Sequence, residues 1–320
     1  MTERERMIRA LRREAIEGHV PHFELVYYLT MEKFGKVHPE HRYYAQWNQM
    51  SEKERQLSLD DMADCFIWAA ETYHHDAIFL HSPVRQNLNR ELAQRIRDRT
   101  GNQYFIMMHN DPTFSIPDGD HMMQFAAQMY DEPEKLHEIA KVSLENSIRQ
   151  AMEFQGTGLI DGFAFCSDYA FNVNPFFTPD QFAEFIFPYL RDSIAACHEM
   201  GFYVIKHTDG NINPILSQIV DAKPDALHSI DPQGHMSLAG VREKYGGQVA
   251  TIGNVNCGLL QTGTQEEADA DVRRCLHEGM DDGKNGFIFS TSNCVYTGLP
   301  LERYERMIDI WQKEGIYGKR

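Results

Sequence analysis

The sequence predicts an α/β fold, a single (β/α)8 TIM barrel that spans residues 1–320 as one domain. Three observations lead to this prediction. Eight short apolar or β-branched runs recur along the chain, helical patterns separate them, and polar side chains gather where the runs end. Parallel strands need a covering crossover, which repeated strand–helix alternation supplies. An open doubly wound sheet is the alternative, but no glycine-rich nucleotide-binding motif follows any of the runs.

The expected strands come in chain order, after an N-terminal helical extension and with a long insert between the first two of them. The extension is the charged amphipathic stretch over residues 1–18, and the insert covers 29–75, with a helical pattern at 51–73. The predicted strands are residues 22–28, 76–82, 104–110, 159–166, 202–208, 226–232, 248–256 and 286–293.

Three further helices are predicted between these strands. Residues 133–154 place apolar side chains three and four positions apart on one face. Residues 178–201 begin with Thr178 as N-cap and Pro179 at the first helical position, and end on a glycine. Residues 264–280 carry acidic side chains in the first turn, where they complement the helix dipole.

Composition excludes several classes of function. The formal net charge is −16, so the chain repels phosphate backbones and anionic membranes, and neither nucleic acid nor a membrane is expected as a partner. The N-terminus has no apolar signal segment, which makes a cytoplasmic location the expectation. Six scattered cysteines without a CxxC pair argue against a disulfide framework or a zinc ribbon.

Polar side chains concentrate at the carboxyl ends of the predicted strands, which all face one mouth of a barrel. The candidates include His81, His109, Asp168, His207, Asp209, Asn256, Cys257 and Cys294. Glu24 differs, because it lies inside the first predicted strand among apolar residues. A carboxylate there either reaches into the barrel mouth or needs a buried partner.

The stretch FYVIKHTDG ends the fifth predicted strand with His207 and Asp209, two positions apart. Alternate residues of a strand point to the same side, so these two side chains project together. They form either a hydrogen-bonded structural pair or two arms of a metal site. Cys294 or Cys257 would complete a three-ligand set, and a thiolate in the set favours zinc. The alternative for both cysteines is that they are small buried hydrophobes.

Several segments resemble the uroporphyrinogen decarboxylase superfamily, whose fold is a single (β/α)8 barrel. They are FAFCSDYAFNVNPFFTPDQFAEFIFPYL, VIKHTDGNINPIL, LHSIDPQG, IGNVNCGLLQTGTQEE and NGFIFSTSNCVYTGLPLERYERMI. One branch of the superfamily decarboxylates porphyrinogens without metal, and it carries an arginine-rich N-terminal segment and a catalytic aspartate after the second strand. Here the N-terminal stretch VPHFELVYYLTMEKFG has no arginine, and the second predicted strand ends in His81.

The other branch comprises zinc-dependent, corrinoid-linked methyltransferases. Its coenzyme M members bind zinc through an HxC pair after the fifth strand and a cysteine after the eighth. The resemblance therefore implies His207 and Cys294 as ligands, with Asp209 in the place of the first cysteine and Cys257 as an auxiliary ligand. An oxygen ligand in place of sulfur makes the zinc harder and more Lewis acidic.

The resemblance implies a zinc-dependent methyltransferase that moves a methyl group between a small molecule and cobalamin. The small molecule is a methoxy compound or similar donor, or a thiol acceptor, and the corrinoid is carried by a partner protein. The expected catalytic residues are Glu24, His81 and Asp168, and the expected substrate-binding residues are His109, Tyr169 and Asn256. A metal-independent decarboxylase and a non-catalytic small-molecule-binding barrel are the alternatives. Barrels of this superfamily often pair, so a homodimer is among the expectations.

Overall fold

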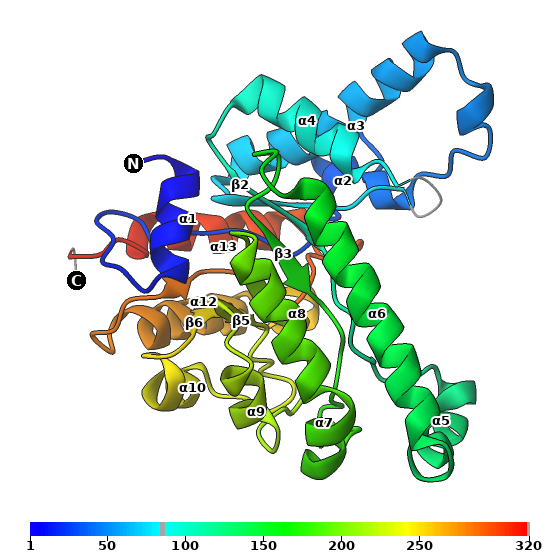
Figure 1. Ribbon diagram of the computed structural model, residues 1–320. Coiled ribbons are helices and arrows are strands. Elements are labelled where there is room, and N and C mark those ends of the chain that lie inside the picture. The colour runs from blue at the N-terminus through cyan, green and yellow to red at the C-terminus, as the bar shows by residue number, and fades with distance from the viewer. Residues whose placement is uncertain (84–86, 319–320) are drawn as a thin grey trace.

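The structure is a computed structural model that describes residues 1–83 and 87–318 (Figure 1). Its centre is a sheet of seven parallel strands, which neighbour one another in chain order. The strands are β1 (Ala77–Leu80), β2 (Phe105–His109), β3 (Gly162–Phe165), β4 (Tyr203–His207), β5 (Ala226–His228), β6 (Ala250–Ile252) and β7 (Phe287–Ile288). The α/β architecture with a parallel sheet is thus as predicted.

Helices connect the strands and cover the sheet. They are α1 (Glu3–Leu11), α2 (Thr30–Phe34), α3 (Glu52–Tyr73), α4 (Asn89–Thr100), α5 (Gly119–Asp131), α6 (Pro133–Phe154), α7 (Pro179–Phe185), α8 (Phe187–Glu199), α9 (Leu216–Asp221), α10 (Leu238–Tyr245), α11 (Cys257–Thr262), α12 (Gln265–Met280) and α13 (Leu301–Glu314). Two 3-10 helices, Pro39–His41 and Trp47–Gln49, lie in the segment before α3.

Residues 21–28 lie between the first and the last strand of the sheet. On one side, the Asp76 amide, just before β1, donates to the carbonyl of His22 at 2.6 Å. On the other side, parallel bridges join His22 to Phe289 and Tyr27 to Val295, beyond β7. This segment therefore connects the two edges of the sheet through backbone hydrogen bonds.

The expected first strand, 22–28, does not form a regular strand, because the carboxylates of Glu24 and Asp76 accept hydrogen bonds in place of backbone carbonyls. Between the two bridges, the Thr291 amide donates to the carboxylate of Glu24 at 3.1 Å and not to a backbone carbonyl. Likewise, the His22 amide donates to the carboxylate of Asp76 at 2.8 Å. Carboxylates thus replace ladder partners on both sides, and the segment keeps only isolated bridges.

The other seven predicted strands are present but shorter than expected. The fifth sheet strand, β5, ends at His228, although the expected strand ran to residue 232. Ser229 and Ile230 have φ angles of 85° and 46° there, which end an extended strand. The chain therefore turns directly after β5.

Two of the three predicted helices match closely, and the third is divided. α6 has the predicted bounds, and α12 begins one residue after its N-cap Thr264. The expected helix at 178–201 begins as predicted, with Thr178 as N-cap, but it splits into α7 and α8 at Ile186. Pro188 lacks the amide that would bond to the carbonyl four residues earlier, which explains the break.

Side chains on the strands alternate between two apolar layers. In β1, Ala77 and Phe79 point into the cluster enclosed by the sheet, whereas Ile78 and Leu80 belong to the cluster between sheet and helices. α1 contributes Met7, Ala10 and Leu11 to the enclosed cluster.

Two ion pairs attach α1 to the amino ends of strands. Arg6 contacts Asp76, which precedes β1, at 2.6 Å, and Arg4 contacts Asp161, which precedes β3, at 2.7 Å. α1 therefore covers the amino end of the sheet, and the polar residues that follow the strands lie at the opposite end. Among the described residues, no helix has the length and apolar content needed to cross a membrane.

Candidate metal centre

Three potential metal ligands converge at the carboxyl ends of β3 and β4. The Nε2 atom of His207 lies 3.9 Å from Oδ1 of Asp168 and 3.8 Å from Oδ1 of Asp209. In the described part of the chain, these are the residues whose ligand atoms form a group within 4.8 Å of one another. The predicted pair His207 and Asp209 is thus brought together, and Asp168, expected as a catalytic residue, joins them.

Hydrogen bonds orient both carboxylates. Oδ1 of Asp168 accepts the amide hydrogen of Asp209 at 3.0 Å. Asp209 in turn accepts a hydrogen bond from the Ser229 hydroxyl at 2.7 Å, and its other oxygen accepts one from the side-chain amide of Asn293. The carboxylates are therefore held by donor groups that follow three different strands, β4, β5 and β7.

This arrangement concentrates negative charge in a partly buried place. Burial raises the pKa of Asp209 to about 7, although the Ser229 hydrogen bond opposes that rise, and the charges of Asp168 and Asp231 raise the pKa further. The buried cation next to His207 in the chain, Lys206, is neutralised by Asp111 at 2.8 Å, and both of their side chains are fully buried. A bound cation would relieve the repulsion, and one imidazole with two carboxylates is a donor set that divalent metals accept.

The second ring nitrogen of His207 faces another histidine. Its Nδ1 atom lies 2.7 Å from Nδ1 of His228. The parallel register pairs these two residues across β4 and β5, so their side chains lie at the same level on the same face. Burial lowers the pKa of both imidazoles, which keeps them neutral and able to act as ligand or acceptor.

The two predicted cysteine ligands lie outside the three-residue group. Cys294 is linked to it through its neighbour: the Cys294 amide donates to Oδ1 of Asn293 at 2.6 Å, while Asn293 donates to Asp209. Cys257 is buried, and its sulfur faces the carbonyl of Cys294 and the hydroxyl of Ser292. Burial raises the pKa of each thiol to about 12, which favours the protonated form as long as no metal binds.

The predicted catalytic and substrate-binding histidines follow β1 and β2. Nδ1 of His81 lies 3.5 Å from the carboxylate of Glu40, and its Nε2 atom is buried without a hydrogen-bond partner. Burial lowers the pKa of His81 to about 4. His109 is exposed at the end of β2. Glu40, which also accepts a hydrogen bond from Tyr28 at 2.6 Å, brings the insert into contact with this end of the sheet.

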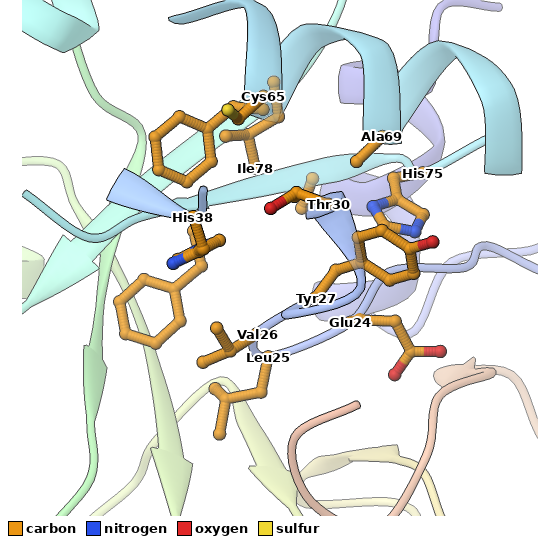
Figure 2. A pocket seen from close by; sticks show the side chains of 13 residues that line it. Glu24, Leu25, Val26, Tyr27, Thr30, His38, Cys65, Ala69, His75 and Ile78 are labelled. Carbon is orange, nitrogen blue, oxygen red and sulfur yellow. The ribbon is translucent and has the colours of Figure 1, made fainter. Parts of the chain in front are cut away.

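Glu24 does not reach the solvent. Its carboxylate is fully buried and accepts hydrogen bonds from the amide and hydroxyl of Thr291 and from the hydroxyl of Ser290. It is also a lining residue of a cavity of about 30 Å³ beneath α3, but Figure 2 shows the carboxylate pointing away from Cys65 and Ala69 of that helix. Room for about one water excludes this cavity as a substrate pocket.

The two remaining predicted substrate-binding residues have structural contacts. Tyr169 is fully buried, with its hydroxyl 2.6 Å from that of Thr113 and its ring 4.2 Å from the Lys206 ammonium. Asn256 is the N-cap of α11 and accepts the amide hydrogens of Gly258 and Leu259. Neither contact depends on a substrate.

Asp168 was not predicted from the sequence as a potential metal ligand, and His228 was not predicted as the partner of His207. A signal for Asp168 was present, because it follows β3 as Asp209 follows β4, and the carboxyl ends of neighbouring parallel strands lie side by side. The role of His228 depends on register between strands, which a single sequence does not display.

Comparisons with known proteins agree with this architecture. The structure of a methyltransferase from Methanosarcina mazei superposes with a TM-score of 0.76 at 18% identity, covering 98% of this chain and 99% of that one. GH5_18 from Streptomyces cattleya follows at a TM-score of 0.49 with 10% identity, covering 93% and 82%. That weaker likeness carries no argument about the site. No curated protein sequence matches significantly.

The family model for uroporphyrinogen decarboxylase (URO-D) matches residues 116–313. The match spans most of the chain and includes His207, Asp209, Asp168 and both cysteines that follow the last strands. The chain therefore belongs to the uroporphyrinogen decarboxylase family.

Proposed function

We propose that this protein is a zinc-dependent methyltransferase that moves a methyl group between a small molecule and a corrinoid carried by a partner protein. The observation that carries the proposal is the convergence of Asp168, His207 and Asp209 at the barrel mouth. Family membership and the fold likeness to a methyltransferase support it. We further propose that residues 21–28 take the place of an eighth strand, so that the barrel is closed around this site.

In this proposal, His207 and Asp209 hold the metal, with Asp168 or Cys294 as a further ligand. Zinc bound there supplies Lewis acidity, which activates a methoxy oxygen as leaving group or a thiol as nucleophile. Asp168 keeps 44% of its side chain exposed, so the group is accessible from the barrel mouth. His81 and His109 border the same mouth and would contact the substrate. The corrinoid protein would dock there, and the protein would act in the cytoplasm as a monomer or a homodimer.

The charges at the mouth favour this reaction over decarboxylation of a porphyrinogen. Asp168, Asp209 and Asp231 make the mouth acidic, which repels a substrate with several carboxylates. Lys206 offers no compensating charge, because its ammonium binds Asp111 and donates to the carbonyls of Phe165 and Ser167. The charge of Lys206 is therefore neutralised by protein groups and does not attract a carboxylated substrate.

Metal content tests the proposal. We expect about one zinc per chain in protein purified without added metal. His207→Ala and Asp209→Ala should lose it, and Cys294→Ala should lose it if the thiolate is a ligand. His121→Ala, an exposed histidine at the start of α5, is the matched control and should retain the metal.

The companion measurement is methyl transfer from methoxy compounds to free cob(I)alamin before and after chelation. The proposal requires that activity disappears with the metal and returns when zinc is added. Zinc retained in both His207→Ala and Asp209→Ala would exclude the ligand set. Full decarboxylase activity of the protein after chelation would exclude the proposed methyltransferase function.

A further inference from the structure

A line of buried polar side chains leads from His207 to the segment before β1. Nδ1 of His207 lies 2.7 Å from Nδ1 of His228, and Nε2 of His228 lies 3.4 Å from the Ser290 hydroxyl. That hydroxyl donates to Oε2 of Glu24 at 3.2 Å. His228 and Ser290 are completely buried, and Glu24 and His207 are nearly so. Water is therefore not available to these groups as an alternative partner.

The contacts of Glu24 determine which atoms along this line donate hydrogen bonds and which accept them. Its Oε2 atom accepts the amide hydrogen of Thr291 at 3.1 Å, so this oxygen is an acceptor. Its other oxygen lies 3.2 Å from Nε2 of His22, whose Nδ1 faces the carbonyl of Tyr73. Oε2 keeps its acceptor role whether a shared proton resides on His22 or on Oε1.

From Glu24 the hydrogens can be assigned one by one. A hydroxyl has a single hydrogen, and that of Ser290 is directed to Glu24, so its oxygen accepts from Nε2–H of His228. A neutral imidazole carries one N–H, so Nδ1 of His228 is an acceptor. The hydrogen between the two rings then belongs to His207, whose Nε2 atom is left with a free lone pair toward Asp168 and Asp209.

We propose that Glu24 and Ser290, acting through His228, hold His207 in the Nδ1–H tautomer and thereby prepare its Nε2 atom as a metal ligand. They are positioning residues, since none of them lies in the group of potential ligands. The assignment of the tautomer stands on hydrogen-bond geometry and on the neutral form of the two buried imidazoles, whereas its purpose rests on the proposed function. Outer partners of this kind fix the ring orientation and increase the basicity of a ligating histidine.

Nitrogen NMR of metal-free protein labelled with 15N-histidine tests the tautomer, with His207→Gln identifying the signals. We expect Nδ1–H and unprotonated Nε2 for His207 in the wild type near neutral pH. Ser290→Ala removes the link to Glu24 and should produce a mixture of tautomers. Ser193→Ala is the control, because Ser193 is equally buried but bonds to Ser147, between α6 and α8.

Two substitutions of Glu24 separate polarity from packing. Glu24→Gln can keep a carbonyl toward Ser290 and turn its NH2 toward His22, so the tautomer should be preserved. Glu24→Met has similar size but no acceptor, and the tautomer should become mixed. A single Nδ1–H tautomer of His207 in the Glu24→Met variant would show that Glu24 does not hold this tautomer.

Zinc affinity, measured by competition with a chromophoric chelator, tests the purpose. Ser290→Ala and Glu24→Met should weaken binding roughly 10–100-fold, while Glu24→Gln and Ser193→Ala should bind as the wild type does. Nε2–H on His207 in the wild type would overturn the proposal whatever metal binds. The expected tautomer with unchanged zinc affinity in Ser290→Ala would overturn the positioning role. The expected tautomer in a protein that binds no zinc would instead overturn the proposed function.

Discussion

His207 and His228 place their Nδ1 atoms 2.7 Å apart because the parallel register of β4 and β5 pairs the two residues. One nitrogen of the potential metal ligand is thereby occupied by its neighbour on the sheet, and the other is left facing Asp168 and Asp209. The same strand carries Lys206 on its other face, where it pairs with Asp111. A single strand thus presents a neutral imidazole on one face and a neutralised cation on the other.

Lys206→Met should destabilise the protein strongly. Its ammonium and the Asp111 carboxylate are fully buried, 2.8 Å apart, and loss of one partner leaves the other charge uncompensated. We expect the free energy of unfolding to fall by about 3–5 kcal/mol, measured by urea denaturation. Arg191→Ala, at the exposed pair with Asp192, is the control and should change stability little.

The double variant Lys206→Met with Asp111→Leu should recover part of the loss, because neither buried charge remains. A double variant that is less stable than Lys206→Met would show that the carboxylate is stabilised by its other partners, the Thr113 hydroxyl and the Ser167 amide.

Stability should depend on pH through Asp111. Burial would raise the pKa of this carboxyl. The charge of Lys206, together with the hydrogen bonds that Asp111 accepts from Lys206, Thr113 and Ser167, outweighs burial and lowers the pKa to about 2. Because the folded-state pKa lies below the ordinary value of 3.8, the stabilisation is complete above that value and is lost as the pH falls toward 2.

Urea denaturation of wild type and Asp111→Asn should therefore give curves that converge in acid. We expect the difference in their free energies of unfolding to shrink by about 1 kcal/mol between about pH 5 and about pH 3. A constant difference across this range would mean that Asp111 is not held in its ionised form by Lys206.

Gly210→Ala should displace Asp209 and abolish binding of the proposed zinc while the fold remains. Gly210 has a φ angle of +79°, and an added Cβ would lie 2.4 Å from the carbonyl oxygen of Ala170. Gly298→Ala is the matched control, since its φ is +93° but nothing lies within 4 Å of the added atom. Both substitutions strain the backbone, at roughly 1–3 kcal/mol.

Metal analysis and circular dichroism together distinguish the two variants. Only Gly210→Ala should show lost zinc with intact secondary structure. Equal zinc content in both variants would indicate that the turn after His207 adapts without moving its carboxylate.

Gly279→Ala should destabilise α12 despite the better helix propensity of alanine. A Cβ at this position would lie 2.4 Å from atoms of the buried Phe287 ring. Overpacking of about 1–3 kcal/mol should exceed the ~1 kcal/mol gained from propensity. Gly247→Ala, where nothing lies within 4 Å, should leave the midpoint of thermal unfolding nearly unchanged. A Gly279→Ala variant more stable than wild type would show that Phe287 moves at little cost.

Much of the architecture could be predicted from the sequence because local patterns specify it. The spacing of apolar residues predicted α6 with its bounds, and the N-cap residue Thr178 predicted where α7 begins. The acidic first turn of the pattern at 264–280 indicated the start of α12. Proximity of His207 and Asp209 followed from the two-residue repeat of a strand. These features depend on neighbours in the chain.

Features that depend on contacts between distant segments were decided only by the tertiary structure. The segment at 22–28 has the composition of a strand, but the Thr291 amide donates to the Glu24 carboxylate and not to a backbone carbonyl of that segment. These two residues are 267 positions apart, so no local sequence pattern indicates their contact. Pairing of His207 with His228, and the approach of Asp168 to His207 and Asp209, likewise arise from register between strands. The sequence alone determined which chemical groups stand at the strand ends. Only folding determined which of them meet, because register and closure are properties of the whole sheet.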